Sequence, residues 1–278
     1  MTDYKAAISA RLGPRGTFSA CFALSIHKSG STLMHNMISA ACLRNGIPSA
    51  NIPHLLFNEG LRDADWDTDA GLLPFFEDGR VYVGFRSLPP LFARPGILQE
   101  RKSVLLVRDP RDALVSQYFS FGGRYISHAR PAKNASKFVS RLRTSAHLDI
   151  DAYVLAQAEN YLGKLVAYQR SLDFDNVLLR RYEEVYFDKE RFLADIFHHF
   201  GIPVPRCVIR EVAAASDVRP LKERRGQHIR KGTPGDHREK LQPRTIERLT
   251  RLFAPVCRDF GYALEAGAPR ARASGATA

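Results

Sequence analysis

Short apolar runs alternate with longer stretches of helical periodicity along most of this chain. The apolar runs cover residues 21–26, 81–85, 104–107 and 177–179, and they predict buried strands. The helical patterns cover residues 32–44, 111–121, 151–170, 189–200 and 243–260. Buried strands separated by helices favour a parallel sheet covered on both faces. We therefore predict an α/β fold with a central parallel sheet flanked by helices, which binds ligands at the carboxyl ends of its strands.

The length of 278 residues fits one large domain or two small ones. With 25% charged and 45% hydrophobic residues, the composition excludes collagen-like, coiled-coil and wholly disordered chains. We predict an N-terminal segment over residues 1–17, a single folded domain over residues 18–264, and a disordered tail over residues 265–278. The tail is rich in Ala, Gly and Arg and cannot supply a core.

Four cysteines, Cys21, Cys42, Cys207 and Cys257, stand far apart and form no C-x-x-C pair. They predict neither a zinc site nor a disulfide framework. The longest early apolar stretch, residues 20–24, is far shorter than the roughly 18 residues of a membrane span. Residues 1–15 also lack a secretory pattern. We therefore expect no metal, no membrane span and a cytoplasmic location.

The first chemical motif, HKSGST, joins the run at 21–26 to the helical pattern that follows it. Gly30 permits a tight turn there, and the backbone N–H groups at a helix start face one concavity. Lys28 and the neighbouring hydroxyl groups add donors, so the segment predicts a P-loop-like phosphate cradle. It is not the Walker pattern, because Lys28 precedes the glycine. An ordinary helix cap of serine and glycine is the simpler alternative.

The second motif, VRDPRDALVS, follows the run at 104–107. Arg108 ends the predicted strand, Pro110 turns the chain, and Ser116 lies about two helical turns further along. A guanidinium group matches phosphate oxygens in a planar fork, so Arg108 and Ser116 can hold a second anionic group. The alternative is a structural ion pair between Arg108 and Asp112.

The third motif, RKGTPGDHREK, lies in the most basic part of the chain. Residues 219–251 hold eleven Lys or Arg and four Asp or Glu, which is more than half of the net charge of +12. Such concentrated positive charge attracts nucleic acid, a membrane surface or small polyphosphates. Alone, the segment is most simply a solvated basic surface. With the other two motifs, it suggests a ligand that carries phosphates at both ends.

In their order and separation, the three motifs resemble those of the cytosolic-type sulfotransferases, which use 3′-phosphoadenosine 5′-phosphosulfate (PAPS). That family typically reads Y-P-K-S-G-T-T-W, R-N-P-K-D-x-x-V-S-Y-Y and R-K-G-x-x-G-D-W-K. This chain reads IHKSGSTL, RDPRDALVSQY and RKGTPGDHREK, and the resemblance extends over residues 20–264. It implies a PAPS-dependent sulfotransferase that moves a sulfuryl group in line to a hydroxyl or amine of a small-molecule acceptor, with adenosine 3′,5′-bisphosphate (PAP) as the product.

The resemblance also implies a role for individual residues. The 5′-phosphosulfate would be held by Lys28, Ser29, Gly30, Ser31 and Thr32. The 3′-phosphate would be held by Arg108, Ser116, Arg230, Lys231 and Gly232. Tyr182 lies in a stretch similar to the family's Y-E-D segment and would approach the adenine. Leu33 replaces the family's usual Trp, which in that family forms one wall of the adenine site.

The general base is the missing part of this resemblance. Lys28 suits the charge that builds on the departing phosphate, but a hydroxyl acceptor also needs a base. The family's K-T-H-L-P segment corresponds here to FRSLP, so Ser87 stands where the family has its His. We prefer His54 as the base, because NIPHLLFNEG resembles the segment that lines the family's acceptor pocket. Glu59, in the same segment, and His27, beside Lys28, are the alternatives.

Two other classes of function stay open at this point. A nucleotide kinase or another P-loop-type phosphotransferase would need a lysine after the glycine and an aspartate for Mg²⁺, a role for which Asp109 could be argued. A nucleic-acid-binding protein could use residues 219–251, but no binding motif or interleaved aromatic residues accompany that charge. We therefore expect a small-molecule acceptor and no nucleic-acid partner. The oligomeric state cannot be read from the sequence.

Overall fold

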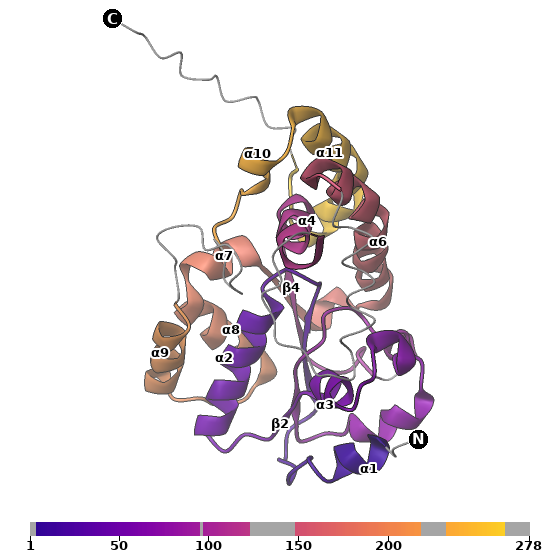
Figure 1. The fold of residues 1–278 in the computed structure, drawn as a ribbon. Helices are drawn as coiled ribbons and strands as arrows, with labels where there is room; N and C mark the ends of the chain where they lie inside the picture. The colour runs from indigo at the N-terminus through magenta and orange to yellow at the C-terminus, as the bar shows by residue number, and fades with distance from the viewer. Residues whose placement is uncertain (1–3, 95–96, 123–147, 218–231, 265–278) are drawn as a thin grey trace, which may run out of the picture.

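The computed structural model describes residues 4–94, 97–122, 148–217 and 232–264, whose arrangement is shown in Figure 1. Five parallel strands form one sheet in the order β2–β3–β1–β4–β5. The strands are β1 (Cys21–Ser25), β2 (Ser49–Ala50), β3 (Val81–Tyr82), β4 (Ser103–Val107) and β5 (Val177–Arg181). The predicted α/β fold with a central parallel sheet is confirmed.

Helices pack on both faces of this sheet. One face carries α2 (Ser31–Arg44), α8 (Lys189–Phe200) and α9 (Arg206–Ala215), which lie together in Figure 1. The other face carries α4 (Pro110–Gln117), α6 (Ile150–Ser171) and α11 (Pro243–Cys257). The shorter helices are α1 (Tyr4–Ser9), α3 (Ile52–Asn58), α7 (Tyr182–Phe187) and α10 (His237–Lys240). Short 3₁₀ segments are Asp63–Asp65, Ala70–Phe75, Pro90–Ala93, Phe174–Asn176 and Arg258–Phe260.

The central strands are apolar throughout because their side chains alternate between two buried clusters. In β1, Cys21 and Ala23 belong to the cluster under α2, α8 and α9. Phe22 and Leu24 belong to the cluster under α4, α6 and α11. Successive side chains of a strand point to opposite faces, so a strand covered on both sides reads as a continuous apolar run. This burial explains why the strands could be found in the sequence.

The structure corrects several predicted boundaries and adds elements. The helix predicted at 189–200 is confirmed as α8, whereas the one predicted at 111–121 ends at Gln117 and continues as a π-helical turn over Tyr118–Gly122. Strand β2 has only two residues and gives no apolar run. Helices α1, α3, α7 and α10 were not predicted because they are too short to show a period. The ten-residue α9 was missed although Ile209, Val212 and Ala213 mark its buried face.

The N-terminal segment predicted over residues 1–17 contains α1, which packs against α3. The tail predicted over residues 265–278 lies outside the described residues. In the ranges that the structure describes, no helix is long and apolar enough to cross a membrane. Because all five strands are parallel, their carboxyl ends share one edge of the sheet. The segments that follow β1 and β4 at that edge carry the first two predicted motifs, and β5 leads directly into Tyr182 at the start of α7.

Candidate active site

The loop between β1 and α2 forms a sharp turn at the carboxyl edge of the sheet. Lys28 and Gly30 have left-handed backbone conformations, with φ angles of 68° and 93°. Gly30 is the N-cap of α2, and no side chain caps this 14-residue helix. The N–H groups of its first turn, which includes Ser31 and Thr32, are therefore available to an anion. The predicted P-loop-like strand, loop and helix are present.

Ser29 braces this loop from inside. Its side chain is fully buried, and its hydroxyl donates to the carbonyl oxygens of Ile26 at 2.5 Å and Leu106 at 3.0 Å. Its backbone N–H also donates to the carbonyl of Ile26, at 3.1 Å. Ser29 thus ties the loop to the ends of β1 and β4. The contact expected between Ser29 and a phosphosulfate stays a prediction.

Lys28 places its amino group beside the hydroxyl group of Ser120. Nζ of Lys28 donates to Oγ of Ser120, which follows α4, at 2.7 Å. The pKa of Lys28 is lowered to about 8, chiefly because the amine is buried and also because the guanidinium groups of Arg108 and Arg86 are nearby. A cation in a desolvated place among other cations is stabilised strongly by a bound anion.

Arg108 follows β4 and is only 7% exposed. Its Nε is buried and has no hydrogen-bond partner among the residues described. Its Nη1 reaches the carbonyl oxygen of Lys28 only at 3.5 Å, and its Nη2 lies 3.7 Å from Oδ2 of Asp112. The predicted pair of Arg108 and Asp112 therefore exists, but it is long. Because burying N–H donors without close acceptors is unfavourable, this arginine is well suited to an anion supplied from outside.

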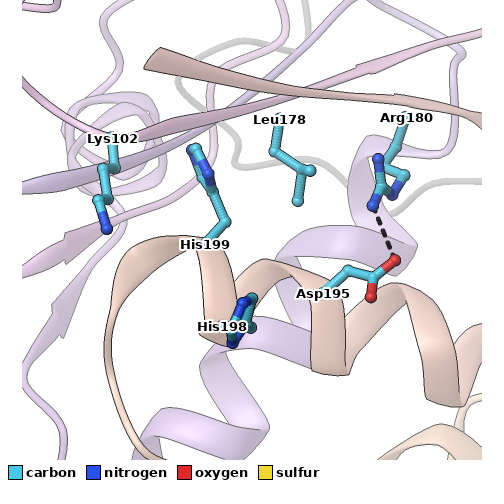
Figure 2. A pocket seen from close by; sticks show the side chains of 6 residues that line it. All are labelled: Lys102, Leu178, Arg180, Asp195, His198 and His199. Carbon is cyan, nitrogen blue, oxygen red and sulfur yellow. Dashed lines mark hydrogen bonds and ion pairs between the residues drawn. The ribbon is translucent and has the colours of Figure 1, made fainter. Parts of the chain in front are cut away.

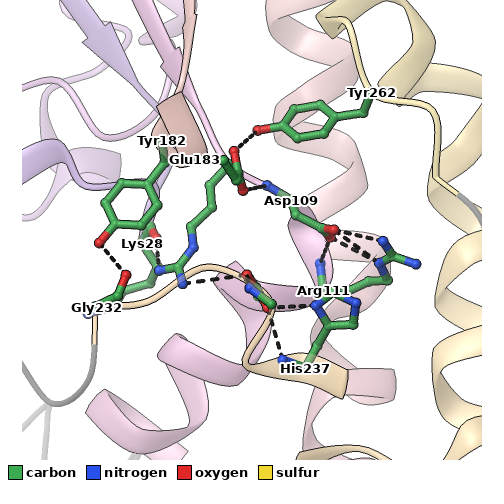
Figure 3. A network of polar contacts seen from close by, with 11 residues as sticks. Lys28, Asp109, Arg111, Tyr182, Glu183, Gly232, His237 and Tyr262 are labelled. Atoms are coloured by element: carbon green, nitrogen blue, oxygen red, sulfur yellow. Dashed lines mark hydrogen bonds and ion pairs between the residues drawn. The ribbon is translucent and has the colours of Figure 1, made fainter. Parts of the chain in front are cut away.

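Tyr182 connects all three motifs. Its hydroxyl donates to the carbonyl oxygen of Gly232 at 2.7 Å, as Figure 3 shows. The Cζ atom of Arg108 lies 4.4 Å from the centre of the Tyr182 ring, which is a cation–π contact. The ring also packs on Gly30 of the first motif. Arg108 and Gly30 both contact this ring. The expected contact between Tyr182 and an adenine stays a prediction.

Asp112, on α4, fixes the third motif to the second. Oδ1 accepts from both the backbone N–H and the ring Nδ1 of His237, at 2.9 Å and 2.6 Å. Oδ2 accepts from the backbone N–H of Gly235 at 2.6 Å. Burial opposes ionisation of this carboxyl group, but the bonds from His237 and the charge of Arg108 hold its pKa far below the usual value. Asp112 is therefore a buried carboxylate that organises this part of the site.

A second polar network fixes the ends of β4 and β5, and Figure 3 shows its members. The carboxylate of Asp109 accepts a hydrogen bond from the backbone N–H of Arg111 and forms an ion pair with the guanidinium of Arg111 at 2.7 Å. The N–H of Asp109 donates to the carboxylate of Glu183 at 3.0 Å. The hydroxyl of Tyr262 also donates to the carboxylate of Glu183, at 2.6 Å. Because Asp109 is engaged in this way, the Mg²⁺ role that a kinase requires of it is disfavoured.

The remaining predicted site residues occupy the following positions. Ser116 is half-buried on α4, the helix that Asp109 caps. His54 is exposed on α3, where its Nε2 lies 3.2 Å from Nδ2 of Asn58. Glu59 pairs with Arg11 at 3.1 Å, and His27 is half-buried beside Lys28. Arg230 and Lys231 lie outside the described residues.

An open pocket of about 340 Å³ lies away from these loops, between β5 and α8 (Figure 2). Three of its polar side chains have partners within the protein. Arg180 pairs with Asp195 at 2.7 Å, and His199 contacts the carbonyl oxygen of Asn176 at 3.2 Å. The pocket lies near the amino end of β4, where Lys102 precedes the strand. It is separate from the candidate site, which lies at the carboxyl ends.

Sequence reasoning missed the residues that organise the site rather than line it. Asp112 was considered only as a partner of Arg108, and His237, Ser120 and Glu183 were not singled out. The sequence held one usable signal, because His237 follows Gly235 and Asp236 where the resembled family has a tryptophan. A buried donor at that position needs an acceptor on another element. Which element supplies the acceptor follows only from the fold.

Comparisons with known proteins identify similar folds and a matching family. The mouse sulfotransferase SULT7A1, solved with PAP, is 17% identical, with 91% of this chain and 89% of that chain covered and a TM-score of 0.57. A putative steroid sulphotransferase of Arabidopsis thaliana is 18% identical, with coverage of 94% and 83% and a TM-score of 0.49. No curated protein sequence matches. Residues 19–261 match the family described as the sulfotransferase domain, and the chain therefore belongs to the sulfotransferase family.

Proposed function

We propose that this sulfotransferase takes its sulfuryl group from PAPS and passes it to a hydroxyl or amine of a small-molecule acceptor. The observation that carries the proposal is Arg108, a buried arginine whose Nε has no partner in the described part of the chain. It lies at the same sheet edge as the loop containing Lys28, to whose carbonyl its Nη1 points. Two separate anion sites joined in this way suit a nucleotide that is phosphorylated at both its 3′ and 5′ positions.

The residues present fit such a nucleotide. Lys28 and the first N–H groups of α2 would hold the 5′-phosphosulfate, with the hydroxyls of Ser31 and Thr32 in the same turn. Arg108 and Ser116 would hold the 3′-phosphate, helped by Gly232 and by Arg230 and Lys231, which precede Gly232 in the chain. The mouse sulfotransferase SULT7A1 was solved in complex with PAP, which supports this assignment.

PAPS supplies a sulfuryl group on a phosphate that becomes the leaving group. Lys28 would place its ammonium beside that phosphate and stabilise the negative charge as it builds. Its contact with Ser120 orients the amine, and Lys28 and Gly30 both adopt left-handed backbone conformations in the same turn. Removal of one preorganised donor of this kind typically raises the barrier by about 3–4 kcal/mol.

We retain His54 as the proposed general base. It lies in the first turn of α3, four residues beyond β2, and so at the carboxyl edge that also carries Lys28. Strand β2 is two positions from β1 in the sheet, with β3 between them, so the two segments leave the same edge about 10 Å apart. Ser87, which follows β3 between these strands, cannot accept a proton at neutral pH without activation.

Calorimetry and mass spectrometry test the proposal. PAP should bind without Mg²⁺, and incubation with PAPS and a panel of hydroxylated compounds should add one SO₃ group to an acceptor. Lys28→Ala should abolish transfer, whereas Arg108→Ala should mainly weaken the binding of PAP. A preference for Mg-ATP over PAP would support the kinase alternative, and salt-sensitive binding of oligonucleotides would support the nucleic-acid alternative.

A further inference from the structure

Arg108 and Asp112 are both buried, yet they do not form a close ion pair. They are 7% and 1% exposed, and Nη2 of Arg108 stays 3.7 Å from Oδ2 of Asp112. That distance is longer than a hydrogen bond. Opposite charges so deeply buried ordinarily approach to bonding distance. Another interaction must therefore hold the carboxylate of Asp112 away from Arg108.

The third motif occupies that carboxylate. Three donors contact it at 2.6–2.9 Å: the N–H of Gly235, and both the N–H and the ring Nδ1 of His237. A carboxylate offers about four lone-pair positions, so three short bonds use most of its capacity. Oδ1 accepts both bonds from His237, and Oδ2, the oxygen nearer to Arg108, accepts the bond from Gly235. The carboxylate is thereby held in place, and the Nε of Arg108 has no partner in the part of the chain that is described.

We propose that His237 is a positioning residue for nucleotide binding: by bonding to Asp112, it keeps the guanidinium of Arg108 available to the 3′-phosphate. The inference rests on the proposed function, because it takes that phosphate as the anion that Arg108 receives. His237 acts through Asp112 and needs no contact with the nucleotide. When the ring donor is removed, Asp112 turns toward Arg108, and the phosphate must then compete with an internal carboxylate.

The local chain supports this role for His237. The side chain is 2% exposed at the start of α10, so its ring is held within the protein. Gly235, with a φ angle of 88°, turns the chain so that its own N–H and that of His237 reach the same carboxylate. The sequence reads G-D-H where the resembled family reads G-D-W, which makes the imidazole donor a feature of this chain.

Two ligands and two variants test the inference by calorimetry. PAP carries the 3′-phosphate and adenosine 5′-monophosphate lacks it. His237→Phe keeps an aromatic ring but removes Nδ1, and we expect PAP to bind about tenfold more weakly while the affinity for the monophosphate is unchanged. His237→Asn keeps an N–H donor, so its PAP affinity should stay within about threefold of the wild type. His237→Gln, whose longer side chain misplaces the donor, replaces the Phe variant should that one fail to fold.

His199→Gln is the matched control, because His199 contacts the carbonyl oxygen of Asn176 in the separate pocket beside α8. It should leave both affinities unchanged. In an Arg108→Ala background, His237→Phe should cause no further loss, since the effect passes through Arg108. A tenfold loss that persists there, or an unchanged PAP affinity in His237→Phe alone, would overturn the inference. A wild-type protein that does not prefer PAP to the monophosphate would instead contradict the proposed function.

Discussion

Gly30 lies directly against the ring of Tyr182. A Cβ atom placed on Gly30 would come within 2.6 Å of the ring atom Cδ2, much closer than van der Waals contact allows. Gly30 also has a φ angle of 93°, which other residues rarely adopt. The same contact joins the loop of the first motif to Tyr182, whose hydroxyl bonds Gly232 and whose ring contacts Arg108. Gly30 is thus needed both for the turn and for the packing of the site.

Replacement of Gly30 by alanine should therefore be costly. We expect Gly30→Ala to lower the free energy of unfolding by about 2–4 kcal/mol, because backbone strain and displacement of the ring add together. Urea denaturation measures this, and calorimetry should show weaker binding of PAP. Gly163→Ala is the control, since Gly163 lies within α6 and, apart from its chain neighbours and the adjacent helix backbone, no atom of the described residues comes within 4 Å of its added Cβ. The free energy of unfolding of Gly163→Ala should be about 0.5–1 kcal/mol higher than that of the wild type. Equal stabilities of the two variants would contradict the assignment.

The affinity for PAP should depend on the charge of Lys28. Its pKa is lowered to about 8, so the amine is cationic below pH 8 and loses its proton as the pH rises further. The phosphates of the nucleotide are already ionised above pH 7, because their second pKa is about 6. We therefore expect affinity to fall between pH 8 and pH 9.5. Lys28→Arg, whose guanidinium stays charged, should flatten this profile in calorimetric titrations.

Asp112 should make the fold sensitive to acid. The folded protein holds the pKa of Asp112 below its ordinary value of 3.8, so this group contributes stability above that value and loses it as the pH falls below it. Asp112→Asn should lower the free energy of unfolding by about 3–5 kcal/mol at pH 7, because it leaves Arg108 and His237 without a carboxylate. The difference from wild type should shrink in urea unfolding at pH 3. Glu100→Gln, at an exposed position, should change stability little at either pH.

His54 should affect the chemical step without affecting nucleotide binding. With a proton acceptor removed, His54→Ala should reduce kcat by about 10²- to 10⁴-fold once an acceptor has been identified, while the affinity for PAP stays at the wild-type value. Steady-state kinetics and calorimetry measure the two quantities. His27→Ala and Glu59→Gln should be assayed beside it. A normal kcat in His54→Ala with a loss in one of the others would transfer the role to that residue.

The sequence alone determined the fold class, four of the five strands and the sheet edge at which the residues predicted to bind anions lie. The central strands β1 and β4 are buried on both faces, so they appear as apolar runs. Lys28, Gly30 and Arg108 stand directly after such runs, and the carboxyl ends of parallel strands necessarily meet at one edge. These conclusions depend on local pattern and on a general rule of topology, and both can be read from one chain.

Only the tertiary structure decided how these residues are held. Asp112 and His237 are 125 positions apart, and nothing in their local sequences pairs them. Ser29, predicted to contact a ligand, braces the loop because folding brings the carbonyl of Leu106 to its hydroxyl. Nη2 of Arg108 stays 3.7 Å from Asp112, whose carboxylate accepts three bonds from a distant motif. Hydrogen bonds between distant segments form only when the completed core sets their geometry, so one-dimensional patterns do not contain them.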